Sequence, residues 1–196
     1  MSASSASSDD EEDINIFCER SDREMIFNRL WDKIRDYEIR KAKQLINENE
    51  FVIYEICSYI GWSLLKISIV NNTKQITTFL LEKMEYDVLS SKSPKTTLMH
   101  AIKYTKSYNI PLQIVQKFNN VNKKNFKNGK TALHYVAEQY YEVPNHQFNL
   151  AKMLLDHGAD PMIKDNEDKT PIDIVRNDGN DMMVNLLEQY VKSDFQ

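Results

Sequence analysis

Residues 129–137 read GKTALHYVA and residues 168–176 read DKTPIDIVR, so one short pattern occurs twice in this chain. In each copy a threonine, Thr131 or Thr170, has apolar residues two and five positions later. Similar segments begin earlier, at Ser63 with SLLKISI and at Thr96 with TTLMHAI. The four reference positions are 33, 35 and 39 residues apart. A period near 33 residues predicts a stack of helix-turn-helix units.

A second amphipathic segment follows each copy of the pattern. The copy from Thr96 has an apolar Ile-Val pair in this segment, and the other copies have a pair of leucines. These pairs are Leu80 and Leu81, Ile114 and Val115, Leu154 and Leu155, and Leu186 and Leu187. Each unit is therefore expected to contain two antiparallel helices that bury their apolar faces against the neighbouring units.

The copy that begins at residue 129 resembles an ankyrin repeat. Its Thr131, Leu133, His134 and Ala137 match the family's T-P-L-H-x-A-A core, and DHGAD at 156–160 matches the ending of the repeat. The resemblance extends over residues 25–192. It implies an all-α repeat fold, an ankyrin solenoid of about four and a half helix-turn-helix units with β-turn or hairpin connections. It also implies that the His134 imidazole holds adjacent repeats together.

We expect a disordered, acidic, Ser-rich N-terminal tail and lead-in at 1–24 and a short C-terminal tail at 193–196. The repeat domain between them is expected to divide into units at about 25–58, 59–91, 92–126, 127–165 and 166–192. Residues 1–13 are expected to be disordered, because no large apolar side chain follows Met1 in this segment. Ser7 and Ser8 each lie three residues before an acid, which resembles the targets of acidophilic kinases. The alternative is a tail that only solubilises the chain.

Composition favours a helical chain, and the sequence contains no motif for a cofactor. The chain has 196 residues, 41% of them apolar, only 4 glycines, and a net charge of −4. No signal peptide or membrane-spanning segment is predicted, so we expect a location in the cytoplasm, with the nucleus as an alternative. The two cysteines have no metal-ligand spacing, and no phosphate loop or nucleophile motif occurs. We therefore predict no catalytic residue, no metal and no cofactor.

Partner contacts are implied by the resemblance, because ankyrin proteins use the hairpin tips and the exposed side of the first helix. An aromatic group comes first in the chain, followed by lysines in two consecutive units. The implied contact residues are Tyr59, Trp62, Lys92, Lys95, Lys103, Tyr104, Lys127, Lys130 and Glu138. Lysines in an acidic chain predict a protein partner with an acidic surface.

The alternatives are that the lysines only solubilise the tips and that Trp62 packs inside the array. The insertion at 140–148 is a second candidate surface.

The predicted function is an intracellular protein-interaction module that masks a host or cellular signalling protein. The chain is short and its repeats are degenerate. In this it resembles stand-alone ankyrin proteins of poxviruses and polydnaviruses that are similar to inhibitor of kappa-B. That resemblance implies a Rel/NF-κB partner and suppression of NF-κB signalling, although the chain has no DSGxxS degradation signal. Direct inhibition of an enzyme such as a protein kinase, or a scaffold or adaptor role, is the alternative. Five scattered lysines without arginine argue against nucleic-acid binding.

Overall fold

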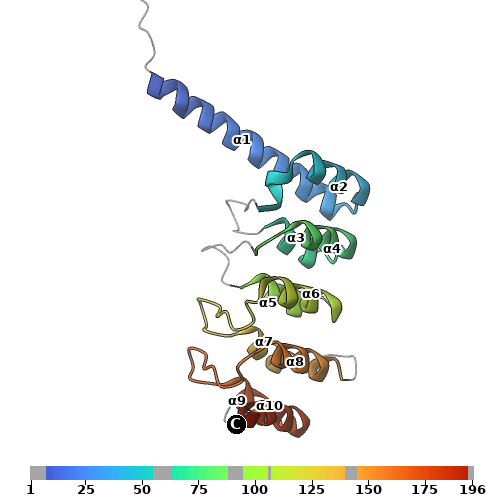
Figure 1. Ribbon diagram of the computed structural model, residues 1–196, viewed down its shortest axis with the longest axis vertical. Helices are drawn as coiled ribbons and strands as arrows, with labels where there is room; N and C mark the ends of the chain where they lie inside the picture. The colour runs from blue at the N-terminus through green and yellow to red at the C-terminus, as the bar shows by residue number, and fades with distance from the viewer. Residues whose placement is uncertain (1–7, 55–62, 88–94, 106, 140–144, 194–196) are drawn as a thin grey trace, which may run out of the picture.

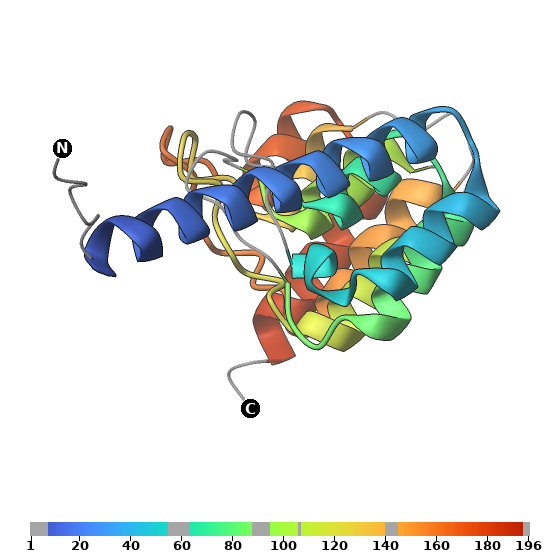
Figure 2. The same cartoon turned by 90° about the horizontal axis from the view of Figure 1, so that it is seen from above.

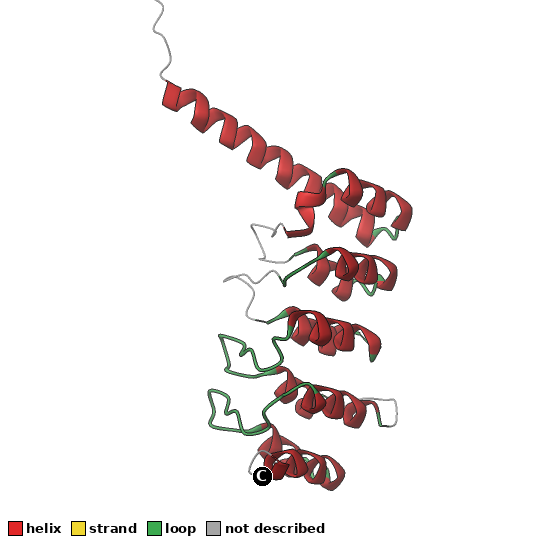
Figure 3. Ribbon diagram, in the orientation of Figure 1, coloured by secondary structure: helices red, strands yellow, loops and turns green. Residues whose placement is uncertain are grey.

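The computed structural model describes residues 8–54, 63–87, 95–105, 107–139 and 145–193. For 8–21 and for 192 and 193 it describes the backbone alone. Helices account for all the regular structure in these ranges, and no strand occurs in them (Figure 3).

The helices form a stack of antiparallel pairs (Figure 1). A 3-10 helix, η1 (Glu50–Tyr54), follows the first pair. The pairs are α1 (Ser8–Arg35) with α2 (Ile39–Glu48), α3 (Leu64–Val70) with α4 (Lys74–Lys83), α5 (Thr97–Tyr104) with α6 (Asn109–Phe118), α7 (Ala132–Glu138) with α8 (His146–Asp156), and α9 (Pro171–Asn177) with α10 (Asp181–Ser193). The all-α repeat fold predicted from the sequence is confirmed.

The reference residues of the sequence pattern are the N-caps of the first helices. The Ser63 hydroxyl accepts a hydrogen bond from the backbone N–H of Lys66, at 3.4 Å. Thr96 and Thr170 accept equivalent bonds from residues three positions later, at 3.3 and 3.2 Å. Such caps satisfy N–H groups that the helix itself leaves without a partner. The spacing of these residues therefore sets where each unit begins.

The core lies between successive units. Helix α3 packs against α1 and α5, and α7 packs against α5 and α9. The residues two positions after the caps are all buried in these contacts, namely Leu65, Leu98, Leu133 and Ile172. The pairs in the second helices that the sequence marked are buried as well. Each unit thus buries its apolar surface on its neighbours, as a repeat array requires.

Helix α1 corrects one expectation. We expected a disordered tail and lead-in up to residue 24, but the helix already begins at Ser8. Its C-terminal part is anchored by Phe27, Leu30 and Ile34, which are buried. Extending an anchored helix adds one backbone hydrogen bond for each residue fixed, so a polar sequence can continue it. The N-terminal part of α1 extends beyond the stack (Figures 1 and 2).

Candidate functional site

The predicted contact residues divide into two groups. Tyr59, Trp62 and Lys92 lie outside the described residues, as do Ser7 and most of the 140–148 insertion. Ser8 is the first residue of α1, where only the backbone is described. Lys95, Lys103, Tyr104, Lys127, Lys130 and Glu138 remain, and all lie on or next to α5 and α7.

Two of the lysines lie on aromatic rings of the first helices. The Lys95 Nζ is 5.4 Å from the ring centroid of Tyr135 on α7. The Lys103 Nζ is 5.3 Å from the ring centroid of Tyr104 on α5. His100 stacks against Tyr104, with ring centroids 5.9 Å apart. We call these five residues, Lys95, His100, Lys103, Tyr104 and Tyr135, the α5–α7 cluster.

The charges in the α5–α7 cluster are of one sign. Burial lowers the pKa of Lys95, and the ammonium group of Lys103 lowers it further. No ion pair among the described residues includes Lys103. Burial, with added repulsion from Lys66, Lys95 and Lys103, lowers the pKa of His100 to about 3. The cluster therefore combines two lysine side chains with two phenol rings and an imidazole that burial keeps neutral.

Lys130 and Glu138 differ from that arrangement because they pair with each other. Burial alone would lower the pKa of Lys130, but the Glu138 carboxylate outweighs this effect and raises it. Lys127 is exposed in the loop before α7, where its backbone N–H donates to the side chain of Asn125 at 2.9 Å. Lys95 and Lys103 instead lie against the rings of Tyr135 and Tyr104.

His134 has the structural role that the ankyrin resemblance implied. Its Nδ1 accepts a hydrogen bond from the backbone N–H of Thr131 at 3.1 Å. Its Nε2 lies 3.1 Å from the backbone carbonyl oxygen of Lys169, the residue just before the next N-cap. The imidazole therefore ties α7 to the start of α9, and this prediction is confirmed.

Sequence reasoning missed that Lys66 occupies the same position in the α3 unit. Both Lys66 and His134 lie three residues after an N-cap. The Lys66 Nζ donates to the carbonyl oxygen of Lys95 at 3.2 Å, and Lys95 again precedes the next N-cap. Lys66 is fully buried, and burial lowers its pKa. Aligning the units on their caps is the signal that could have identified it.

Asp87 supports the same junction. Its carboxylate accepts hydrogen bonds from the Thr97 hydroxyl at 2.6 Å and from the Asn120 side chain at 3.2 Å. Burial raises the pKa of Asp87, whereas these bonds and the Lys66 charge act to lower it. Asp87 thus joins the loop after α4 to α5 and to the loop after α6. The hydrogen bonds of Asp87 and Lys66 thus hold the start of α5 in place beside the α5–α7 cluster.

The burial of His100 predicts a pH dependence of stability. Its pKa is about 3 in the folded chain, and an exposed histidine has a pKa of about 6.5. The unfolded chain therefore binds more protons in this window, so the stabilisation present above pH 6.5 is lost as the pH falls. The free energy of unfolding of the wild type, measured with urea, should therefore fall between pH 6.5 and 5. His100 should contribute up to about 1.4 kcal/mol per pH unit to this fall.

His100→Gln is the variant that isolates this effect, because glutamine does not titrate. The free energy of unfolding of this variant should fall less steeply between pH 6.5 and 5 than that of the wild type. The other histidines with a lowered pKa, His134 and His146, remain in both proteins and cancel in the comparison. Equal slopes would show that His100 is accessible to protons in the folded chain.

The described part of the chain lacks two kinds of feature. No helix there combines the length and apolar character needed to cross a membrane. Nor do three or more His, Cys, Asp or Glu side chains come together there as they would around a metal ion.

Comparison with known proteins identifies the repeats. Residues 71–165 match the family model for "Ankyrin repeats (3 copies)". One similar protein is "Ankyrin repeat-containing protein YGL242C" of Saccharomyces cerevisiae, 31% identical over 68 residues, which are 35% of this chain and 38% of that protein. Another is "Putative E3 ubiquitin-protein ligase XBAT34" of Arabidopsis thaliana, 28% identical over 101 residues, which are 51% of this chain and 25% of that protein.

The aligned regions span well under half of either relative, so the likeness concerns the repeats and not the whole proteins. The matched residues contain the caps Thr96 and Thr131, helix α4, the pairs α5–α6 and α7–α8, and His134. Sequence comparison and helix packing agree that residues 71–165 form ankyrin repeats, a kind of repeat that indicates a protein–protein interaction module.

Proposed function

We propose that this chain binds an acidic surface of a partner protein through the α5–α7 cluster and thereby masks that surface. The observation that carries the proposal is the placement of the Lys95 and Lys103 ammonium groups against two tyrosine rings. The positive charge of the lysines attracts an acidic partner to the surface. Tyrosine rings supply area that a partner can desolvate, and such residues dominate the energy of many interfaces.

The rigidity of the cluster supports the same proposal. The carbonyl oxygen of Lys95 is bound by the buried Lys66, and that of Lys103 accepts a hydrogen bond from Gln139 at 3.4 Å. A surface whose backbone is already fixed loses less conformational entropy when a partner binds. Tyr104 keeps 39% of its surface exposed and is available for contact.

In its narrower form the proposal names a signalling protein of the Rel/NF-κB kind as the partner, in the cytoplasm or nucleus of a host or native cell. This form rests on the resemblance to viral ankyrin proteins that are similar to inhibitor of kappa-B. A protein kinase held in an inhibited state, or a scaffold role, is the alternative. Capture of partners from a cell lysate on the immobilised chain, followed by mass spectrometry, separates these classes.

Reversing both charges, with Lys95→Glu and Lys103→Glu, should weaken binding of the captured partner by about tenfold or more. The loss should come mainly from slower association, and the salt dependence of the association rate should shrink. Tyr104→Ala should instead speed dissociation, because it removes a desolvated ring. Surface plasmon resonance measures both rates.

A matched control applies the same charge change to exposed lysines elsewhere, Lys41→Glu with Lys164→Glu, and should leave both rates close to those of the wild type. Circular dichroism checks that every variant is folded. If the control weakens association as much as the cluster variant does, net charge and not the cluster drives binding. Unchanged rates in the cluster variants would move the contact to the 140–148 insertion.

A further inference from the structure

A second surface lies on the second helices of the first three units. A groove of about 420 Å³ lies on the surface between α2 and α4, and another of about 360 Å³ lies between α4 and α6. Thr78 and Glu82 of α4 line both grooves, so the two meet across that helix. We call the combined surface the outer furrow. Its lining includes Lys43, Lys74, Thr78, Phe79, Glu82 and Lys117.

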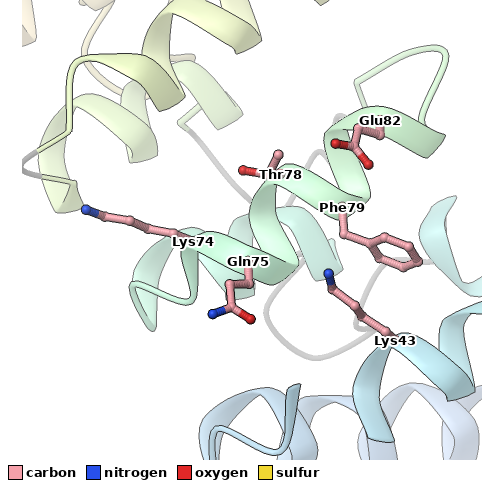
Figure 4. A pocket seen from close by; sticks show the side chains of 6 residues that line it. All are labelled: Lys43, Lys74, Gln75, Thr78, Phe79 and Glu82. Carbon is pink, nitrogen blue, oxygen red and sulfur yellow. The ribbon is translucent and has the colours of Figure 1, made fainter. Parts of the chain in front are cut away.

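The charge of the outer furrow is mainly positive. Three of its lining residues are lysines, one from each of the helices α2, α4 and α6, and Glu82 is the only acid in the lining. The Lys43 Nζ lies 5.0 Å from the ring centroid of Phe79, across the groove between α2 and α4 (Figure 4). Lys83 flanks the same ring at 5.5 Å, but its charge is already paired with Glu50 at 3.0 Å.

The neutral lining residues fit a peptide backbone. Gln75, Gln113 and Gln116 each offer an amide donor and an amide acceptor, and the Thr78 hydroxyl can act as either. An extended segment presents N–H and C=O groups that require such partners when they leave water. Phe79 adds an apolar wall at one end of the furrow (Figure 4). The furrow thus combines polar groups for a backbone with cations spaced along its length.

We propose that the outer furrow binds an acidic peptide segment of a partner, lying in extended form across α4 from the α2–α4 groove to the α4–α6 groove. Its carboxylates would meet Lys43, Lys74 and Lys117, and its backbone would meet the glutamines and Thr78. This surface belongs to the second helices, whereas the α5–α7 cluster belongs to the first helices. The proposal therefore stands independently of the function proposed above, and the two surfaces can hold different ligands.

The test uses the full chain and a short fluorescent peptide of alternating serine and glutamate. Fluorescence anisotropy at low salt should report binding that Lys43→Glu with Lys74→Glu weakens by about tenfold or more. Thr78→Trp should also weaken it, because the larger side chain fills the meeting point of the two grooves without changing charge. NMR amide shifts on adding the peptide should concentrate at Gln75, Thr78 and Gln113.

The matched control is Lys95→Glu with Lys103→Glu, which makes the same charge change on the other surface and should preserve the NMR shifts in the furrow. Loss of all peptide binding in that control, with the furrow variants unaffected, would overturn the proposal and assign the peptide to the α5–α7 cluster. Equal weakening in every charge variant, with Thr78→Trp unaffected, would reduce the effect to net charge and also overturn it.

Discussion

Leu154→Ala should lower the free energy of unfolding by about 2 to 5 kcal/mol. Leu154 has no exposed surface, and it lies on α8, which packs against α7 and α10. Removing its branched end leaves a cavity that the surrounding helices fill only in part. A loss of this size is a large fraction of the stability of a natural domain. Urea unfolding followed by circular dichroism measures it.

The shape of the unfolding curve carries additional information. In a repeat array each unit is stabilised by its neighbours, so weakening one junction can separate the transition into two steps. Met182→Ala is the control, because Met182 lies on α10 with 51% of its surface exposed and should cost little. Equal stability of Leu154→Ala and the wild type would mean that the junction between these units is not the packed core described here.

The start of each unit and the core were predictable from the sequence because both depend on local spacing. A hydroxyl residue followed by apolar positions at two and five residues requires only that the segment be helical with one buried face. Ser63, Thr96 and Thr170 accordingly cap helices, and Leu65, Leu98 and Ile172 are buried. These features repeat, so each copy supported the assignment of the others.

Helix α1 was not predictable from composition. The residues just after Ser8 are acidic, so this segment has no apolar side chain to bury. Considered alone, such a segment is expected to be disordered. The helix depends instead on Phe27, Leu30 and Ile34 farther along, which are buried within the first unit.

The charges of the candidate site were only partly predictable for a related reason. The sequence placed Lys95, Lys103, Lys130 and Glu138 at contact positions. It did not show which group each of these side chains would contact. Lys130 and Glu138 pair, whereas Lys95 and Lys103 approach each other over aromatic rings. Pairing depends on side-chain placement between units, and the insertions that vary the repeat length change that placement. The buried Lys66 bridge escaped notice because lysine is almost never fully buried.

Gly129→Ala should destabilise the array by about 2 to 4 kcal/mol, through backbone strain and a steric clash. Gly129 has φ of +72°, where a side chain is strained, and its new Cβ would lie 2.4 Å from Oδ1 and 2.8 Å from the backbone N of Asn166. Asn166 belongs to the next loop and donates to the carbonyl oxygens of Asn128 and Lys127, at 3.0 and 3.1 Å. The clash therefore acts on the bonds that join two successive loops. Thermal or urea unfolding gives the loss.

Gly158→Ala separates strain from clash, because Gly158 has φ of +83° but no atom within 4 Å of a new Cβ. This glycine ends α8, where its N–H donates to the carbonyl oxygen of Leu155 at 2.9 Å. Strain alone should cost about 1 kcal/mol there. The excess loss in Gly129→Ala then measures the contact between loops, and hydrogen exchange at the Asn166 amide should accelerate in that variant alone. Equal losses, with unchanged exchange at Asn166, would mean that the loops do not hold each other and that the helices alone maintain the stack.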